Sequence, residues 1–302
     1  MYDLIIAGSG PAGLAAGIYA KRAGLNAIVM ERDGVSGGQV LSTYEVDNYP
    51  ALPGISGMDL GSKMREHADR LGVEFVTENI TGISDVDGFI TVHGEGNEYF
   101  TNGVIIATGA HHAELGVKGE KEFQGMGVSY CATCDGAFFT GRDVAVVGGG
   151  DVAVEDAIFL ARNCRKVYLI HRRDSLRAAS SLQEALKKYD NVEYVWNSNV
   201  SEICGNDMVE YVNVVNKISG ETRRIDLNGV FVAVGIIPNS ESFKGIADMD
   251  EKGYLIAGED CRCSTARIYA AGDVRTKQLR QIVTAVADGA NAVTSFQADI
   301  IG

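Results

Sequence analysis

Two cysteines separated by two residues, Cys131 and Cys134, are the most distinctive chemical feature of this 302-residue chain. The spacing allows a small, reducible disulfide ring, in which nearby backbone N–H groups can stabilise a thiolate. Asp135 adjoins the second cysteine and could carry a proton to the leaving thiolate. The pattern predicts a catalytic group of Cys131, Cys134 and Asp135 that cycles between dithiol and disulfide.

Other uses of the six cysteines are weaker alternatives. Cys131 and Cys134 could join Cys261 and Cys263 in a zinc site, but the two pairs lie far apart in the sequence and are expected in different domains. A buried structural disulfide is a further alternative for the first pair. Cys261 and Cys263 alternate along a strand-like stretch, so they should face opposite sides and not bond to each other. Two cysteines are expected to be ordinary packing residues, Cys164 and Cys204.

A glycine turn near the N-terminus predicts a dinucleotide site. It follows an expected strand at Tyr2–Ala7, opens an expected helix at Pro11–Gly24, and is a complete G-x-G-x-x-G: Gly8, Ser9, Gly10, Pro11, Ala12 and Gly13. Such a turn lets a pyrophosphate approach the backbone at the helix N-terminus. Glu31 ends the next expected strand, Asn26–Met30, where a carboxylate can accept hydrogen bonds from both ribose hydroxyls. A glycine turn without a ligand is the alternative.

The same pattern returns at the same spacing in the middle of the chain. The second turn is of the G-x-G-x-x-A type, Gly148, Gly149, Gly150, Asp151, Val152 and Ala153, between expected strands Asp143–Val147 and Lys166–Ile170 and beside an expected helix at Val152–Asn163. The position that matches Glu31 holds a basic cluster instead: His171, Arg172 and Arg173, followed by Arg177. Guanidinium groups would hold a ribose 2′-phosphate, so this site should prefer NADPH to NADH. A solvated basic turn is the alternative.

The two repeated units predict an α/β protein with two Rossmann-like, three-layer nucleotide-binding domains. Val104–Gly109 and Val230–Gly235 resemble each other and look like late strands that close the two sheets. Ile268–Asp273 needs a sheet to join, and the first domain is the expected host. The first domain is therefore expected to be discontinuous, at 1–115 and 246–302, with the second inserted at 118–243.

Composition excludes several partners. A formal net charge of −13 repels phosphate backbones, so no nucleic-acid partner is expected. The uncharged stretch Leu4–Ala20 holds four glycines and a proline and is too short for a span, so we expect no membrane partner and a cytoplasmic protein. His111 and His112 are expected in a solvated loop, and no metal site is expected.

Taken together, these motifs resemble those of the low-molecular-weight, bacterial-type thioredoxin reductases, in the class II pyridine nucleotide-disulfide oxidoreductase family. The resemblance covers essentially the whole chain. It includes further motifs at Gly37–Gln39, Glu45–Pro50, Ala107–Gly109, Ala271–Asp273 and Arg280–Gln281. Val152 stands where the family usually has Ser or Thr, and Asp156 stands where Glu is commoner.

The resemblance implies an NADPH-dependent flavoprotein that reduces thioredoxin or a thioredoxin-like protein, with FAD in the first site, NADPH in the inserted domain, and a homodimer. Electrons would pass from NADPH through FAD to the disulfide, with Cys134 next to the flavin, Cys131 attacking thioredoxin, and Asp135 as acid and base. The residues expected to bind the cofactors are Gly8, Ser9, Gly10, Pro11, Ala12, Gly13, Glu31, Arg32, Gly38, Gln39, Asn48, Gly109, Gly148, Gly150, Asp151, Val152, Ala153, His171, Arg172, Arg173, Arg177, Gly272, Asp273, Arg280, Gln281 and Ile282.

The sequence leaves alternatives open for the identity of the electron donor and of the electron acceptor. Reduced ferredoxin could replace NADPH, and a glutaredoxin-like protein could replace thioredoxin. A non-enzymatic flavoprotein that senses redox state is an alternative of another class. The disulfide must meet both the flavin and a protein partner, and one rigid arrangement is not expected to serve both encounters. The family resemblance implies a domain rotation, which fits hinges near Val117–Gly119 and Ile236–Pro238.

Overall fold

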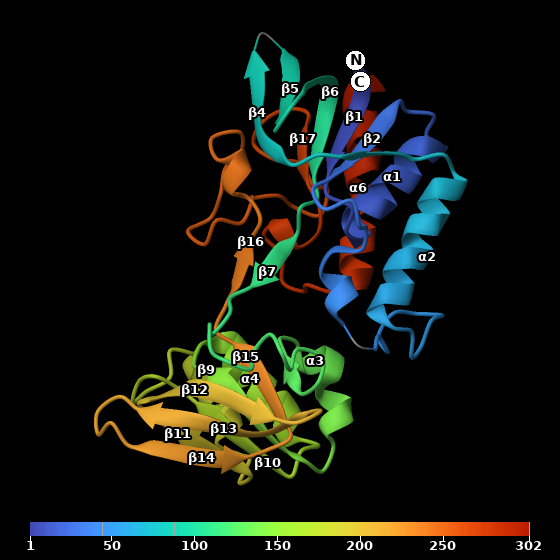
Figure 1. Ribbon diagram of the computed structural model, residues 1–302. Coiled ribbons are helices and arrows are strands. Elements are labelled where there is room, and N and C mark those ends of the chain that lie inside the picture. The colour runs from blue at the N-terminus through green and yellow to red at the C-terminus, as the bar shows by residue number, and fades with distance from the viewer. Residues whose placement is uncertain (44, 87, 302) are drawn as a thin grey trace. The chain divides into compact units, whose positions relative to one another are not determined.

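The chain folds into two compact units. The computed structural model describes residues 1–43, 45–86 and 88–301. Its first unit joins Met1–His111 to the residues from Ile237 onward, and its second unit is His112–Ile236 (Figure 1). One unit is thus inserted in the other. The return crossing comes earlier than the boundary expected at 243–246, because residues 237–243 fold with the first unit.

The first unit is built on one seven-stranded mixed sheet in the order β3-β2-β1-β6-β5-β4, with β17 also on β6. Its central strand β1 is a continuous apolar run, and Leu4 to Ala7 are fully buried, as expected for a strand covered on both faces. β17 pairs in parallel with the end of β6, so Ile268 joins the first sheet as predicted. The strands are β1 (Tyr2–Ala7), β2 (Ala27–Glu31), β3 (Glu74–Thr77), β4 (Ile80–Val86), β5 (Phe89–Gly94), β6 (Glu98–Ile106) and β17 (Ile268–Ala270).

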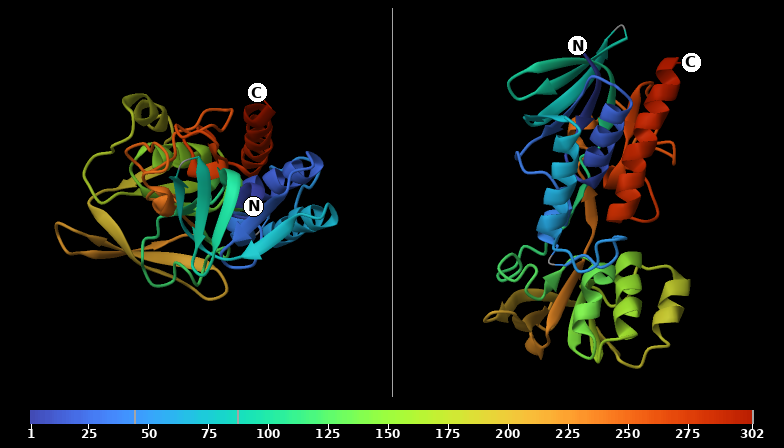
Figure 2. Two further views of the ribbon diagram at one scale, coloured as in Figure 1. Left: turned by 90° about the horizontal axis from the view of Figure 1, so that it is seen from above. Right: turned by 90° about the vertical axis from the view of Figure 1, so that its right-hand side faces the viewer.

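Two long helices cover one face of this sheet, and they touch closely. α1 (Pro11–Arg22) follows the first glycine turn, and α6 (Ile282–Ile301) lies alongside it (Figure 2). A Cβ on Gly289 of α6 would overlap the carbonyl oxygen of Ala12, so only glycine permits this approach. The remaining helical segments are α2 (Gly57–Arg70), η1 (Gly38–Ser42), η3 (Glu241–Phe243) and η4 (Gly272–Val274).

The second unit has three layers around a five-stranded parallel sheet in the order β11-β10-β9-β15-β8. Alternate residues of β9 face opposite layers: Val144 and Val146 pack with the helices, and Ala145 and Val147 pack with a three-stranded antiparallel sheet. The parallel strands are β8 (Val128–Ser129), β9 (Asp143–Gly148), β10 (Lys166–Ile170), β11 (Val192–Val195) and β15 (Gly229–Ala233). The other elements are α3 (Ala132–Asp135), η2 (Gly136–Phe139), α4 (Asp151–Ala161), α5 (Ser180–Leu186), β12 (Ser198–Gly205), β13 (Val209–Asn216) and β14 (Thr222–Asp226).

The two chain crossings between the units pair with each other. They run through β7 (Ala110–His112) and β16 (Ile236–Pro238), which form a two-stranded sheet. His111 and His112 therefore lie in a strand and not in the expected loop. The His111 ring is hydrogen-bonded to Asn239 at 2.7 Å, and the His112 ring stacks on Tyr130. Within the described part of the chain, no helix combines the length and the apolar character needed to cross a bilayer.

Candidate active site

Cys131 and Cys134 form a disulfide at the start of α3, with their Cα atoms 5.3 Å apart. Cys131 is the extended residue that precedes the helix, and its carbonyl oxygen accepts hydrogen bonds from the backbone N–H groups of Cys134 and Asp135. This tight turn closes the ring that the two-residue spacing predicts. The other four cysteines are free, so the oxidised pair is the one the sequence singled out.

Asp135 lies in a mostly buried place beside the disulfide. One carboxylate oxygen accepts a hydrogen bond from Ser129 Oγ at 2.6 Å, and the other, Oδ1, is buried without a recorded partner. Burial raises the pKa of Asp135, and the hydrogen bond from Ser129 opposes that rise. A carboxyl group with a raised pKa keeps its proton to higher pH and is a suitable donor to a leaving thiolate.

Ser129 is a site residue that sequence reasoning missed. Its Oγ also accepts a hydrogen bond from the backbone N–H of Cys131 at 3.1 Å, so one hydroxyl links the turn to the acid. Ser129 ends the two-residue strand β8. Nothing in its spacing from Asp135 is periodic, so the sequence carries no signal for this contact.

The first glycine turn has the geometry that a dinucleotide requires. Gly8 has φ +100°, and a Cβ on Gly13 would overlap the carbonyl oxygen of Gly8. A Cβ on Gly10 would meet no atom within 4 Å, which leaves its backbone open to a ligand. Gly38, at the start of η1, lies close to Gly10, because a Cβ added to Gly38 would be 3.3 Å from the Cα of Gly10. Two segments distant in sequence therefore meet at this turn.

Glu31 is fixed at the end of β2 by the turn itself. Its Oε2 accepts hydrogen bonds from both the backbone N–H and the hydroxyl of Ser9, at 2.9 and 2.6 Å. The carboxylate is thereby oriented beside the turn. Arg32, the next residue, is exposed and forms an ion pair with Asp33 at 2.9 Å.

Several other residues expected at the first site lie near the N-terminus of α6 in the sequence or contact it. Asn48 Nδ2 donates to Gln281 Oε1 at 2.8 Å, next to Ile282, the first residue of the helix. Asp273 Oδ1 and Arg280 Nε are both buried with no recorded hydrogen-bond partner. Burial raises the pKa of Asp273. Two buried polar atoms without partners suit a polar ligand that completes their hydrogen bonds, and a dinucleotide offers the donors and acceptors to do so.

Gly109 and Gln39 are less closely tied to this group. Gly109 has φ +68° with open space around it, and its carbonyl oxygen accepts a hydrogen bond from Asn239 N at 3.0 Å. Gln39 lies half-buried in η1, directly after Gly38.

The second glycine turn is held by the loop that follows β10. Arg177 N donates to Gly149 O at 2.7 Å, and Ala179 N donates to Asp151 Oδ1 at 2.8 Å. Asp151, expected to bind cofactor, therefore also positions the loop. A Cβ on Gly150 would meet nothing within 4 Å, as at Gly10, while Val152 is exposed and Ala153 is fully buried.

The basic cluster divides into one buried histidine and three exposed arginines. His171 is 4% exposed, and its ring packs where a Cβ on Gly149 would overlap it. Burial and the charges of the neighbouring arginines lower the pKa of His171, which favours its neutral form. Its Nε2 is buried without a hydrogen-bond partner among the described residues. The exposed guanidinium groups carry the positive charge, and they belong to Arg172, Arg173 and Arg177.

The zinc alternative finds no support in the cysteine geometry. Cys131 and Cys134 are bonded to each other, and no group of three or more His, Cys, Asp or Glu within residues 1–43, 45–86 and 88–301 is placed to hold a metal ion. Cys261 and Cys263 lie outside the assigned strands, and Arg262 between them forms an isolated antiparallel bridge with Tyr269. The two thiols pack in different hydrophobic clusters and are both free, so they face apart as expected. Burial raises the pKa of each of these two thiols to about 12.

The fold and the site define a class of protein, and comparisons with known proteins identify the same class. Residues 2–289 match the family model described as pyridine nucleotide-disulphide oxidoreductase, and the chain belongs to that family. The resemblance seen in the sequence is confirmed.

Named relatives within the family agree with one another. A thioredoxin reductase of Listeria innocua is 45% identical over 298 residues, which is 98% of this chain and 93% of that protein. A thioredoxin reductase of Bacillus subtilis is 44% identical over 98% of this chain and 94% of its own length. The crystal structure of thioredoxin reductase from Streptococcus pyogenes has a TM-score of 0.95 at 43% identity and covers 100% of this chain and 98% of its own.

Proposed function

We propose that this protein is a thioredoxin reductase that passes electrons from NADPH through FAD and the Cys131–Cys134 disulfide to thioredoxin or a thioredoxin-like protein. The observation that carries the proposal is the disulfide itself, which lies beside a buried acid and directly before a nucleotide-binding β-α-β unit. Relatives of nearly equal length that are named thioredoxin reductase support the choice of acceptor.

The chain's own residues would divide the work at the redox centre. Cys131 would attack the disulfide of the protein substrate, and Cys134 would then displace the reduced partner and restore the intramolecular disulfide. Asp135 would supply and retrieve the proton, since its raised pKa lets the carboxyl group keep its proton to higher pH. Bound FAD would supply the two-electron relay between nicotinamide and disulfide.

The two glycine turns would divide the nucleotides by charge. Glu31, held by Ser9, would accept hydrogen bonds from the ribose of FAD, and the buried atoms of Asp273 and Arg280 would complete that site. The exposed Arg172 and Arg173 would pair with the 2′-phosphate of NADPH. A carboxylate at that position would repel the phosphate, so the cluster favours NADPH over NADH. We also propose, from the resemblance, that two chains form a homodimer.

Anaerobic stopped-flow mixing tests the proposal. The purified protein, expected to be yellow with bound flavin, is mixed with NADPH and separately with NADH while flavin absorbance is followed. Fast bleaching by NADPH and slow bleaching by NADH are expected, followed by reduction of added thioredoxin. A protein that carries flavin but is bleached by neither coenzyme would contradict the NADPH assignment and favour a donor such as reduced ferredoxin.

A further inference from the structure

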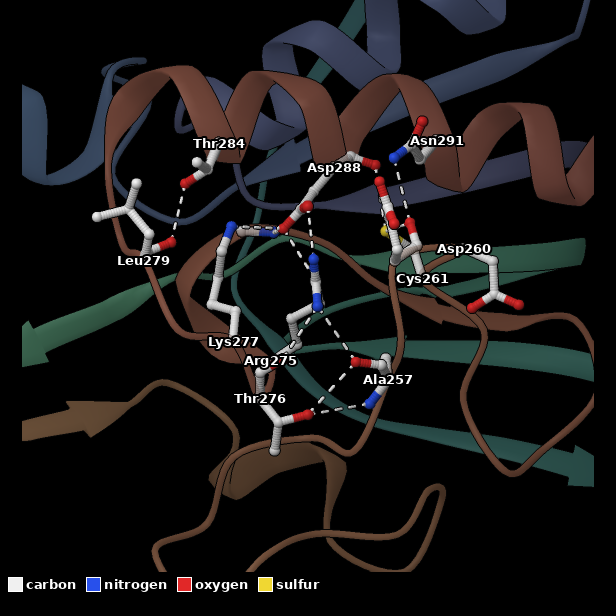
Figure 3. A network of polar contacts seen from close by, with 12 residues as sticks. Ala257, Asp260, Cys261, Arg275, Thr276, Lys277, Leu279, Thr284, Asp288 and Asn291 are labelled. Atoms are coloured by element: carbon white, nitrogen blue, oxygen red, sulfur yellow. Dashed lines mark hydrogen bonds and ion pairs between the residues drawn. The ribbon is translucent and has the colours of Figure 1, made fainter.

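The carboxylate of Asp288 on α6 accepts hydrogen bonds from three residues of the segment Gly272–Lys277. Figure 3 shows its contacts with Arg275 and Lys277. Its Oδ2 accepts from Gly272 N at 2.9 Å, from Arg275 Nε at 2.9 Å and from Lys277 Nζ at 2.8 Å. Its Oδ1 accepts from Arg275 Nη2 at 2.7 Å. The side chains of Arg275, Lys277 and Asp288 are only 9%, 6% and 6% exposed, so these bonds are largely shielded from solvent.

Arg275 extends this cluster to a third segment. Its Nη1 donates to the carbonyl oxygens of Ala257 and Thr276, at 3.2 and 2.9 Å. The thiol of Cys261 donates to the carbonyl oxygen of Asp288 at 3.4 Å. The cluster therefore ties the loop before β17, the loop after it, and α6 into one body.

The bond to Gly272 matters because of what this residue controls. Gly272 has φ +79°, and a Cβ there would lie 3.0 Å from the Cβ of Ala12 in the first glycine turn. The next residue is Asp273, whose Oδ1 is buried without a recorded partner. Asp288 thus binds the backbone of Gly272, and the next residue, Asp273, has a carboxyl oxygen without a hydrogen-bond partner in the described part of the chain, near the turn proposed for the dinucleotide.

Asp288 also compensates the charge of two buried cations, Arg275 and Lys277. Two buried cations share its single negative charge, so the three side chains carry a net charge of about +1. Removing the carboxylate alone would leave both cations uncompensated in a place with little solvent. The loop would then have to move to hydrate them, and Gly272 and Asp273 would move with it.

We propose that Asp288 is a positioning residue for the dinucleotide site: by holding Gly272 N, Arg275 and Lys277 together, it fixes the turn that presents Asp273 to the cofactor. This inference rests on the proposed use of FAD at this site. It predicts that loss of the carboxylate weakens FAD binding, even where the protein stays folded.

The test compares FAD affinity in variants whose folding is checked separately. Asp288→Ala alone is expected to fold poorly, so Lys277→Met is combined with it, which restores the net charge of the wild-type cluster. Lys277→Met alone and Asp299→Ala serve as controls. Asp299 is a carboxylate of the same helix that forms an ion pair with Arg262 at 2.9 Å and accepts from Tyr269 at 2.6 Å, away from Gly272.

The FAD dissociation constant is measured from the fluorescence of released flavin, at a temperature where circular dichroism shows each apoprotein folded. The double variant should bind FAD at least about tenfold more weakly than Lys277→Met, as expected for lost hydrogen bonds to a charged group. Asp299→Ala should lower the melting temperature but leave FAD affinity unchanged. Equal affinity in the single and double variants would overturn the inference, as would an equal loss in Asp299→Ala. A wild-type protein that binds no FAD would overturn the proposed function as well.

Discussion

Ser129 Oγ lies between the backbone of Cys131 and the carboxylate of Asp135, and it sets the balance at the redox centre. Burial favours the protonated acid, and the hydroxyl favours the ionised one. The acid is therefore tuned by one uncharged neighbour, whose removal should change the pKa in a known direction.

Substitution of Ser129 should shift the pH dependence of turnover. In Ser129→Ala the ionised carboxylate loses its donor, so the pKa of Asp135 rises and its protonated form persists to higher pH. The basic limb of the pH profile for thioredoxin reduction should therefore move to higher pH. Ser129→Thr, which keeps the hydroxyl, should restore the wild-type profile. Asp135→Asn should lower turnover by about 10²-fold or more. A basic limb in the same place in Ser129→Ala would show that Asp135 is not the group that titrates.

The two cysteines should be separable by trapping. In Cys134→Ser, Cys131 keeps its thiol but lacks the partner that resolves the mixed disulfide. A thioredoxin with a single active-site cysteine, activated as a mixed disulfide with thionitrobenzoate, should therefore be transferred to Cys131 with release of the thionitrobenzoate, and the complex should persist on non-reducing gels. Cys131→Ser should trap none. Both variants should lose steady-state turnover. The reverse trapping pattern would exchange the roles proposed for the two sulfurs.

Each glycine turn is hydrogen-bonded to another segment of its own unit, the end of a strand in the first unit and a loop in the second. Glu31 at the end of β2 is bound by Ser9, and the loop after β10 is bound through Gly149 and Asp151. The second loop buries His171 and leaves its arginines exposed, so selectivity for the coenzyme should reside in the arginines.

Coenzyme preference should follow the guanidinium groups. Combined Arg172→Ala and Arg173→Ala should lower kcat/KM for NADPH by about 10²-fold, since two charge-assisted contacts are lost, and should leave NADH nearly unaffected. Arg165→Ala is the control, because it removes an exposed cation of the same unit that pairs with Asp143 at 2.7 Å. An equal loss for both coenzymes would show that the arginines support the fold and not the 2′-phosphate.

α4 contains a carboxyl group that should make stability depend on pH. Burial, with a smaller contribution from Glu155, raises the pKa of Asp156 from 3.8 to about 7. Between about pH 4 and pH 7 the unfolded chain loses this proton while the native protein keeps it, so native stability falls as pH rises. Above pH 7 the penalty is constant, at no more than about 4 kcal/mol for a shift of about three pKa units.

Asp156→Asn removes this penalty and should stabilise the protein only where the carboxylate is ionised. The melting temperature of the second unit should rise by several degrees at pH 8 and stay unchanged at pH 4. Asp190→Asn, at an exposed position in the same unit, should change neither value. A rise of the same size at both pH values would mean that the gain does not come from the ionisation of Asp156.

The elements bracketed by glycine turns could be predicted closely from sequence, and others could not. The strands Tyr2–Ala7 and Lys166–Ile170 match β1 and β10, and the helix expected at Val152–Asn163 is α4. The antiparallel strands β4–β5 and β12–β14 have no motif to mark them, and the sequence did not place them. The burial of His171 depends on its packing against Gly149, and the role of Asp288 depends on which loop reaches α6. Neither contact leaves a periodic trace in the chain.

For the whole molecule, the position of the crossings changes where motion is expected. The first hinge was expected near Val117–Gly119, but this segment lies inside the second unit. The buried Glu120 accepts hydrogen bonds from the backbone N–H groups of Leu115 and Gly116, each at 2.8 Å. A Cβ on Gly119 would overlap the carbonyl oxygen of Ile203, so this segment is packed and not free to bend. Any hinge is therefore expected in β7 and β16.

A covalent tether between the two units should test the proposed rotation. The disulfide and the flavin would each have two partners to meet, and one fixed arrangement of the units is not expected to serve all these encounters. A non-reducible cross-link between two introduced cysteines, one in each unit, should lower thioredoxin reduction at least tenfold once mass spectrometry shows complete tethering. The same cross-linker placed between two sites within the first unit should leave turnover unchanged. A tether that keeps the nicotinamide site next to the flavin should still allow NADPH to bleach the flavin. A tether that keeps the disulfide next to the flavin should still allow electron transfer from the flavin to the disulfide. Full turnover in a completely tethered protein would show that rotation about β7 and β16 is not part of the catalytic cycle.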